Sequence, residues 1–118
     1  MPNSALYARF ASIIAAHPID ELTQSDLLLV SQNGKIKSFY APFEAINTQA
    51  QVVIVGICPG QQQWRNALLA MQSALALNLP ENEVLNHAKS SGAFSGPIRH
   101  NLTRLLDHIG LNERLGIS

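Results

Sequence analysis

The sequence QVVIVGICPG, residues 51–60, decides the fold that we expect for this chain. After Gln51 come four consecutive β-branched residues, Val52–Val55, a run typical of a strand that is buried on both faces of a parallel sheet. Gly56 ends the run, and Pro59 with Gly60 turns the chain. Residues 61–76 then repeat apolar side chains at helical spacing. Because open α/β sheets bind ligands at the carboxyl ends of their strands, the loop after this strand is the expected functional loop.

The rest of the chain is predicted to be mainly helical, because apolar residues recur every three or four positions. From this spacing we expect helices over residues 4–16, 65–77 and 98–109. Pro80 with Glu81 and Glu83 is typical of a first helical turn and predicts a further helix over 80–89. A short helix or turn is expected over 20–26. Asn33-Gly34 lies between two short apolar runs and predicts a hairpin or extended loop within residues 27–40. Residues 90–97 are small, apart from Phe94, and are expected to form a loop.

A single buried strand cannot make a stable sheet, because each strand needs hydrogen-bonded neighbours. Residues 27–40 could complete a small mixed sheet. We favour the other interpretation, a three-layer α/β/α fold with a central parallel sheet that is incomplete in this chain. Residues 1–118 are then one domain, the N-terminal part of a longer one.

Composition limits the function classes. The chain has 118 residues with 47% hydrophobic content, which fits one globular domain and excludes a disordered one. Eight basic residues balance eight acidic ones, which argues against strongly electrostatic binding of nucleic acid. The single cysteine, Cys58, cannot form an internal disulfide or hold a zinc ion or iron–sulfur cluster alone. We expect a cytoplasmic protein without signal peptide, membrane span, metal or cofactor.

Two short motifs carry a resemblance to a known family. GICPG, residues 56–60, resembles the first active-site motif of the uracil-DNA glycosylase superfamily, which has the form G-x-x-P-G. GAFSG, residues 92–96, precedes a leucine-rich helix that ends in IGL, residues 109–111. Branches of the superfamily that carry an iron–sulfur cluster have a similar loop and helix. The resemblance covers residues 51–111, about half of the chain.

The resemblance implies a protein that takes a flipped or single-stranded nucleobase of DNA into a pocket, where water hydrolyses the N-glycosidic bond. Phe94 would stack on the base, and Cys58 would stand where the superfamily positions the attacking water. The other residues that the resemblance places at the base are Gly56, Ile57, Pro59, Gly60, Gln61 and Ser95.

The chain departs from the superfamily pattern at the catalytic positions. Ile57 and Cys58 replace the usual carboxylate or amide, and the histidine-bearing second motif and the four cluster cysteines have no match in this sequence. Retained catalysis is therefore uncertain. A catalytically inactive nucleobase- or DNA-binding module is one alternative, and an unrelated α/β protein is another. The sequence does not select the base or the oligomeric state.

Two further features of the sequence also have ordinary structural explanations. Cys58 fits a small buried side chain, which is the common role of a free cysteine. His100, Arg104 and His108 are spaced by four and so align on one side of a helix. That stripe suits contact with phosphate, although a solvated polar face is the more common case.

Overall fold

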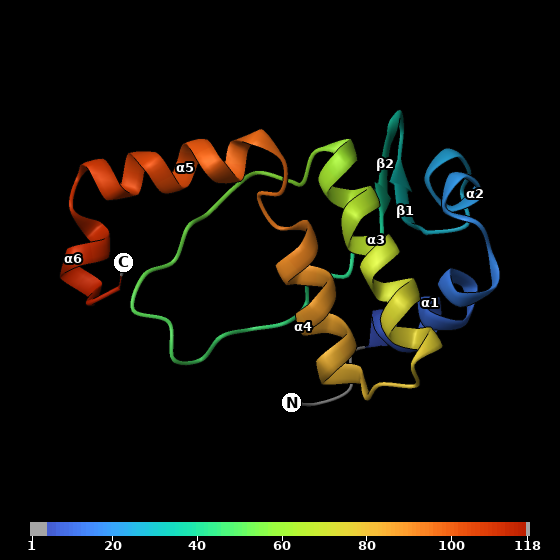
Figure 1. The fold of residues 1–118 in the computed structure, drawn as a ribbon. Coiled ribbons are helices and arrows are strands. Elements are labelled where there is room, and N and C mark those ends of the chain that lie inside the picture. Colours follow the sequence, from blue (N-terminus) through green and yellow to red (C-terminus); the bar gives the residue numbers. More distant parts are fainter. Residues whose placement is uncertain (1–4, 118) are drawn as a thin grey trace.

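Six helices and one antiparallel hairpin make up the computed structural model, which describes residues 5–117 (Figure 1). The elements are α1 (Ala5–Ala16), α2 (Ile19–Gln24), β1 (Leu29–Asn33), β2 (Ile36–Phe39), α3 (Gln61–Ala76), α4 (Glu81–Gly92), α5 (Pro97–His108) and α6 (Leu111–Leu115). The long connection between β2 and α3 contains no helix or strand.

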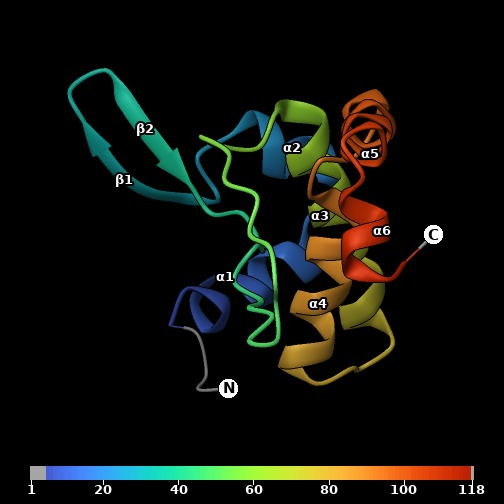
Figure 2. The same cartoon turned by 90° about the vertical axis from the view of Figure 1, so that its left-hand side faces the viewer.

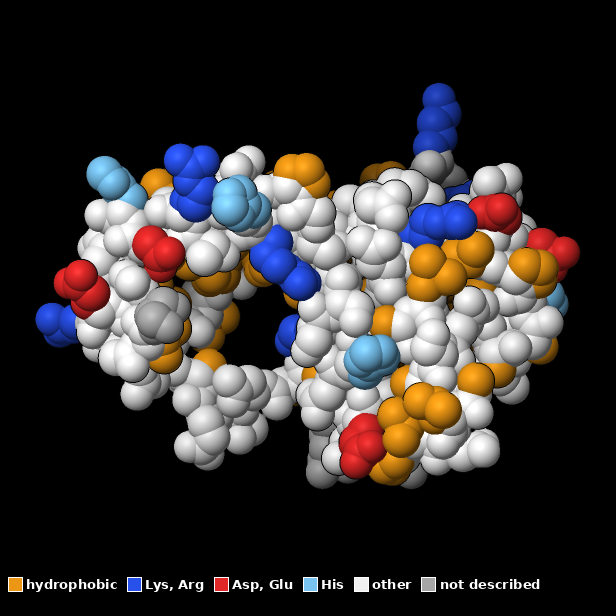
Figure 3. Space-filling view, in the orientation of Figure 1, with side chains coloured by type: hydrophobic (Ala, Val, Ile, Leu, Met, Phe, Trp, Pro, Cys, Tyr) orange, Lys and Arg blue, Asp and Glu red, His pale blue; other side chains and the backbone are white. Residues whose placement is uncertain are grey.

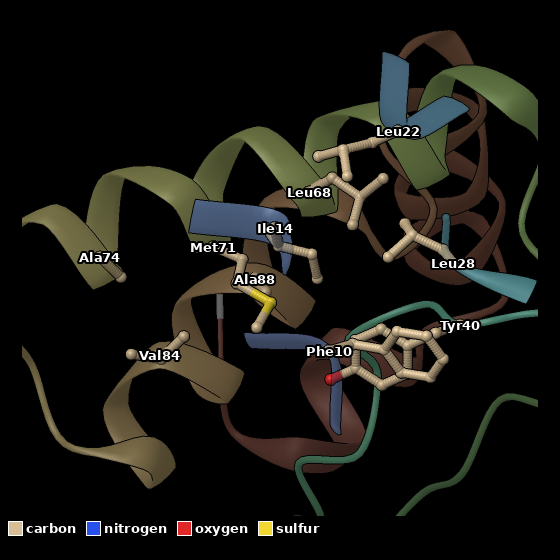
Figure 4. Close-up of a cluster of buried hydrophobic side chains, with 10 residues drawn as sticks. All are labelled: Phe10, Ile14, Leu22, Leu28, Tyr40, Leu68, Met71, Ala74, Val84 and Ala88. Carbon is tan, nitrogen blue, oxygen red and sulfur yellow. The ribbon is translucent and has the colours of Figure 1, made fainter. Parts of the chain in front are cut away.

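The core forms around α3, which packs against α1, α2 and α4. These helices present apolar residues every three or four positions, so each buries one face and leaves the other in water. Figure 4 shows the buried side chains, with the ring of Phe10 stacked on Tyr40 at a centroid distance of 5.1 Å. The cluster consists of Phe10, Ile14, Leu22, Leu28, Tyr40, Leu68, Met71, Ala74, Val84 and Ala88.

The hairpin prediction is confirmed. Strands β1 and β2 pair antiparallel, with Asn33 opposite Ile36, and project away from the helices (Figure 2). Gly34 has φ +61°, a left-handed value that glycine adopts without steric strain. A register irregularity between Leu29 and Ser31 bends β1 near its start.

The three-layer α/β/α fold with a central parallel sheet is contradicted by the structure. The described residues contain one two-stranded antiparallel sheet, and Val52–Val55 form neither strand nor helix. Their side chains are exposed, and no backbone hydrogen bond joins residues 51–59 to another described residue. The alternative of a mixed sheet fails for the same reason, because β1 and β2 pair only with each other among residues 5–117. A β-branched run favours extended backbone, but a strand forms only beside a hydrogen-bonded neighbour.

The predicted helices are confirmed, with shifted ends. Helix α3 begins at Gln61, directly after Pro59-Gly60, and α4 continues to Gly92 through part of the expected loop. Ser4, which was included in the first predicted helix, lies outside the described residues. Helix α6 was not predicted, because five residues are too few to show a helical period.

None of the helices within residues 5–117 combines the length and the apolar character needed to cross a membrane.

Candidate functional site

A cavity of about 680 Å³ lies between the 54–59 segment and the turn that joins α4 to α5. Its volume falls in the range of small-molecule sites, about 300–1,000 Å³. The wall is mainly apolar and includes four aromatic residues, Phe39, Tyr40, Phe43 and Phe94. Of the described side chains that line it, only Lys89 is charged.

The structure brings together the two segments that the sequence singled out. Gly56 and Phe94 line the same cavity, and a methyl group built on Gly56 would lie 3.9 Å from Cε1 of Phe94. Ile57, Cys58 and Pro59 also line this cavity. Phe94 is half-buried, so its ring reaches the cavity instead of filling the core. The meeting of these segments depends on the packing of α4 against α3, which sets the position of the turn that carries Phe94.

Phe94 has an unusual backbone conformation. Its φ is +53°, a left-handed value that bulky residues adopt only where the surrounding structure enforces it. Such outliers cluster at binding and catalytic sites, where strain fixes the direction of a side chain. Gly96, two residues later, also has a positive φ, +86°, which lets the chain turn into α5.

Two hydrogen-bonded side chains hold this turn in place. Arg99 Nη2 donates to the carbonyl oxygens of Ser90 and Ala93, at 2.7 Å each. Asn66 Nδ2, from α3, donates to Ser95 Oγ at 3.1 Å. The turn is therefore tied both to the end of α4 and to the central helix.

Three predicted site residues do not line the cavity. Gly60 precedes α3, and its amide donates to Gln63 Oε1 at 3.3 Å. Gln61 is exposed in the first turn of α3, and Ser95 is bonded to Asn66 instead of facing the cavity. Cys58 lines the cavity but is exposed, so its interpretation as a small buried side chain is wrong.

Sequence reasoning missed the other aromatic residues that line the wall of this cavity together with Phe94. Phe39, Tyr40 and Phe43 fall at the end of the hairpin and in the connection after it, where the sequence shows no chemical motif. A signal was present, since SFYAPF places three aromatic residues within five positions. Trp64 supports this wall from α3, because its Nε1 donates to the carbonyl oxygen of Tyr40 at 2.9 Å.

A second, more polar cavity of about 530 Å³ adjoins the first and shares Lys89 and Ala93 with it. Its wall also includes Arg99 and Asn86. Lys89 Nζ donates to the carbonyl oxygen of Ala45, and Arg99 to two carbonyl oxygens. Both side chains have further N–H donors, since an ammonium has three and a guanidinium five. The second cavity is therefore suited to an anionic group.

Tyr40 and Glu44 form a partly buried hydrogen bond beneath the cavity, with the phenol donating to the carboxylate. Burial is the main cause that raises the pKa of Tyr40, and the bond and charge of Glu44 raise it further. Burial also raises the pKa of Glu44, more than the bond from Tyr40 lowers it. The pair is thus most stable with the phenol protonated.

This arrangement predicts a loss of stability at alkaline pH. Because the pKa of Tyr40 is higher in the folded protein than the ordinary value of 10.0, its contribution is complete below pH 10 and is lost as the pH rises toward the folded value. Urea titrations at increasing pH should show a falling free energy of unfolding above pH 10. Tyr40→Phe should remove much of this fall and cost about 1 kcal/mol at neutral pH. If the free energy of unfolding of Tyr40→Phe fell above pH 10 as much as that of the natural chain, Tyr40 would not be its cause. Tyr7→Phe tests the other tyrosine, because burial raises the pKa of Tyr7 as well.

No group of three or more histidine, cysteine or acidic side chains comes together as a metal site within the described residues. His100, Arg104 and His108 are all exposed on α5. Exposure fits both a solvated face and a contact with phosphate, so both interpretations of this stripe stay open.

Comparison with curated proteins finds one match in Bacillus subtilis (strain 168), the uncharacterized protein YoxB, at 33% identity over 120 aligned residues. The match covers 98% of this chain and 46% of YoxB, so the chain spans about half the length of that relative. No family model matches the chain, and no solved structure matches it.

Proposed function

We propose that this protein binds a flipped or single-stranded nucleobase of DNA in the cavity between the 54–59 segment and Phe94. The observation that carries the proposal is the placement of Phe94. Its ring stands beside Gly56, on a left-handed backbone held by two neighbouring side chains, in a cavity that Phe39 and Phe43 also line. These are the two segments on which the resemblance to uracil-DNA glycosylases rests.

The wall of the cavity suits a flat aromatic ligand. A base stacks on the face of a phenylalanine ring, and each such contact contributes about 1–3 kcal/mol. The backbone of residues 56–59 has no hydrogen-bond partner among the described residues, so its N–H and C=O groups are available to the edge of a base. Ser38 and Gln63 add polar side chains to the same wall.

The adjoining cavity supports a nucleotide over a free base. A nucleotide carries both a base and a phosphate. Lys89 and Arg99 offer cationic donors for the phosphate next to the aromatic cavity. The balanced net charge of the chain predicts that such binding is weak without the base contact. The exposed Cys58 fits a reducing compartment, so we propose the cytoplasm as the setting.

Binding is favoured over base excision, because the cavity offers no group to activate water. Among residues 5–117, no aspartate, glutamate or histidine lines it, and Gln63 cannot act as a base at neutral pH. Hydrolysis of an N-glycosidic bond needs a water molecule held and polarised at the sugar carbon. We therefore expect binding without release of the base.

The test is fluorescence anisotropy with labelled oligonucleotides, single-stranded and duplex, that carry uracil, hypoxanthine or xanthine. Phe94→Ala should weaken binding about 10- to 100-fold, because it removes the stacking ring. Phe94→Tyr keeps the ring and should bind nearly as well as the natural chain. Ile98→Ala, an exposed apolar deletion outside the cavity, is the matched control and should not change the affinity.

Circular dichroism must first show that each variant is folded. Equal affinity of folded Phe94→Ala and the natural chain would contradict the proposal, as would no binding of any oligonucleotide by the natural chain. Alkali-induced strand cleavage in the same samples detects base release. If the base were released, the proposal of a nucleobase site would stand, and a group outside the described wall would have to activate the water.

A further inference from the structure

An extended apolar segment and an apolar helix face border one opening in the described structure. In Figure 1 the connection before α3 sweeps away from α4 and leaves a gap between them, with α5 above it. The space-filling view shows that side chains leave this gap open and that hydrophobic side chains line it along α5 (Figure 3). The α5 side therefore exposes apolar surface toward this gap, and the apolar side chains of Val52–Val55 are exposed in the connection that borders it.

The segment has the properties of a strand without a neighbour. The exposed fractions of Val52 to Val55 alternate, at 43%, 76%, 44% and 86%, as expected for backbone whose side chains point to opposite sides in turn. No backbone hydrogen bond joins this segment to another described residue. Unpaired extended backbone with apolar side chains accepts a further strand through main-chain hydrogen bonds.

Helix α5 also has an exposed apolar face. It buries no residue, and Ile98, Leu105 and Ile109 are exposed along one stripe. Helices of globular proteins usually bury such a stripe against other elements. Contiguous exposed apolar surface of this kind marks a contact with another polypeptide.

We propose that both surfaces are covered by a further part of the same gene product, one strand of which pairs with Val52–Val55 while its apolar side chains pack on α5. The match to YoxB covers 98% of this chain but only 46% of YoxB. A relative of this chain therefore carries enough further polypeptide to cover both surfaces. Residues 51–60 hold no charged side chain, so an apolar partner suits them. A covalently linked partner is present at high effective concentration, which keeps these surfaces from contacting other proteins.

Hydrogen exchange tests this proposal with the full gene product and with the 118-residue chain, alone and mixed with the separately expressed remainder. In the full product and in the mixture, the amides of Val52–Val55 should exchange about 100-fold more slowly than in the chain alone.

Val53→Asp and Leu105→Asp should each weaken the association of the chain with the remainder at least about tenfold, because each buries an unpaired charge at the contact. Thr103→Asp places the same charge at an exposed position of α5 away from Ile98, Leu105 and Ile109 and should leave the association unchanged.

Three outcomes would overturn the proposal. They are a gene that encodes no polypeptide beyond these residues, exchange at Val52–Val55 that the remainder does not slow, and equal association of both charged variants and the control. A dimer of the 118-residue chain that protects Val52–Val55, detected by sedimentation equilibrium, would instead assign the surface to a second copy. Val53 does not line the nucleobase cavity, so Val53→Asp separates failure of this proposal from failure of the proposed function.

Discussion

Gly92→Ala is expected to destabilise the protein by about 3 kcal/mol, the upper part of the range for overpacked sites. A Cβ at this position would lie 2.6 Å from Cβ of Ala67 and 2.9 Å from the carbonyl oxygen of Gln63. These distances leave no room for a methyl group, and the second neighbour is backbone that cannot move aside without shifting α3. Helix α4 must then separate from α3, which loosens the core and displaces the turn that carries Phe94.

The direction of this effect is opposite to that of helix propensity. In an exposed helix interior, glycine to alanine stabilises by about 1 kcal/mol, so a loss of stability can come only from the close approach of the two helices. Urea denaturation measures the change. His87→Ala, at an exposed position of the same helix, should stay within about 0.5 kcal/mol of the natural chain.

A compensating pair provides a sharper test. Ala67→Gly combined with Gly92→Ala removes the closest contact and leaves the carbonyl of Gln63, so the double variant should recover part of the lost stability relative to the sum of the single changes. A Gly92→Ala protein as stable as the natural chain would show that the two helices are farther apart than described.

Phe10→Ala is expected to cost about 3–5 kcal/mol, the usual range for deletion of a buried aromatic side chain. Phe10 is 1% exposed, and its ring stacks on Tyr40 at an interplanar angle of 16°. The deletion therefore leaves a cavity at the centre of the core and removes an aromatic contact. Because Tyr40 also lines the nucleobase cavity, binding should weaken together with stability.

The matched control for this change is Phe39→Ala. It deletes the same side chain at a position that is 37% exposed, in contact with Trp64 at a ring-centroid distance of 5.7 Å. Its cost should be less than half that of Phe10→Ala, because less apolar surface returns to water. Equal costs in urea denaturation would show that Phe10 does not hold the centre of the core.

The elements that local spacing controls were predictable. Helices α1, α3 and α5 follow from apolar residues three or four positions apart, and the hairpin follows from Asn33-Gly34. Helix α4 follows from Pro80 and the two glutamates of its first turn. The candidate site was predicted in part. Phe94 and the 56–59 segment were identified by motif, whereas Phe39, Tyr40 and Phe43 were found only in the structure, because their role depends on a distant segment that packs opposite them.

By itself, the sequence determined where the chain is helical, where it turns and which side chains are apolar, since these properties depend on neighbours within one or two helical turns. Only the tertiary structure decided whether Val52–Val55 is a buried strand. That choice depends on hydrogen-bonded neighbours from elsewhere in the chain, and the described residues supply none. The tertiary structure also decided that Phe94 faces Gly56, because the packing of α4 on α3 through Gly92 sets the position of that turn.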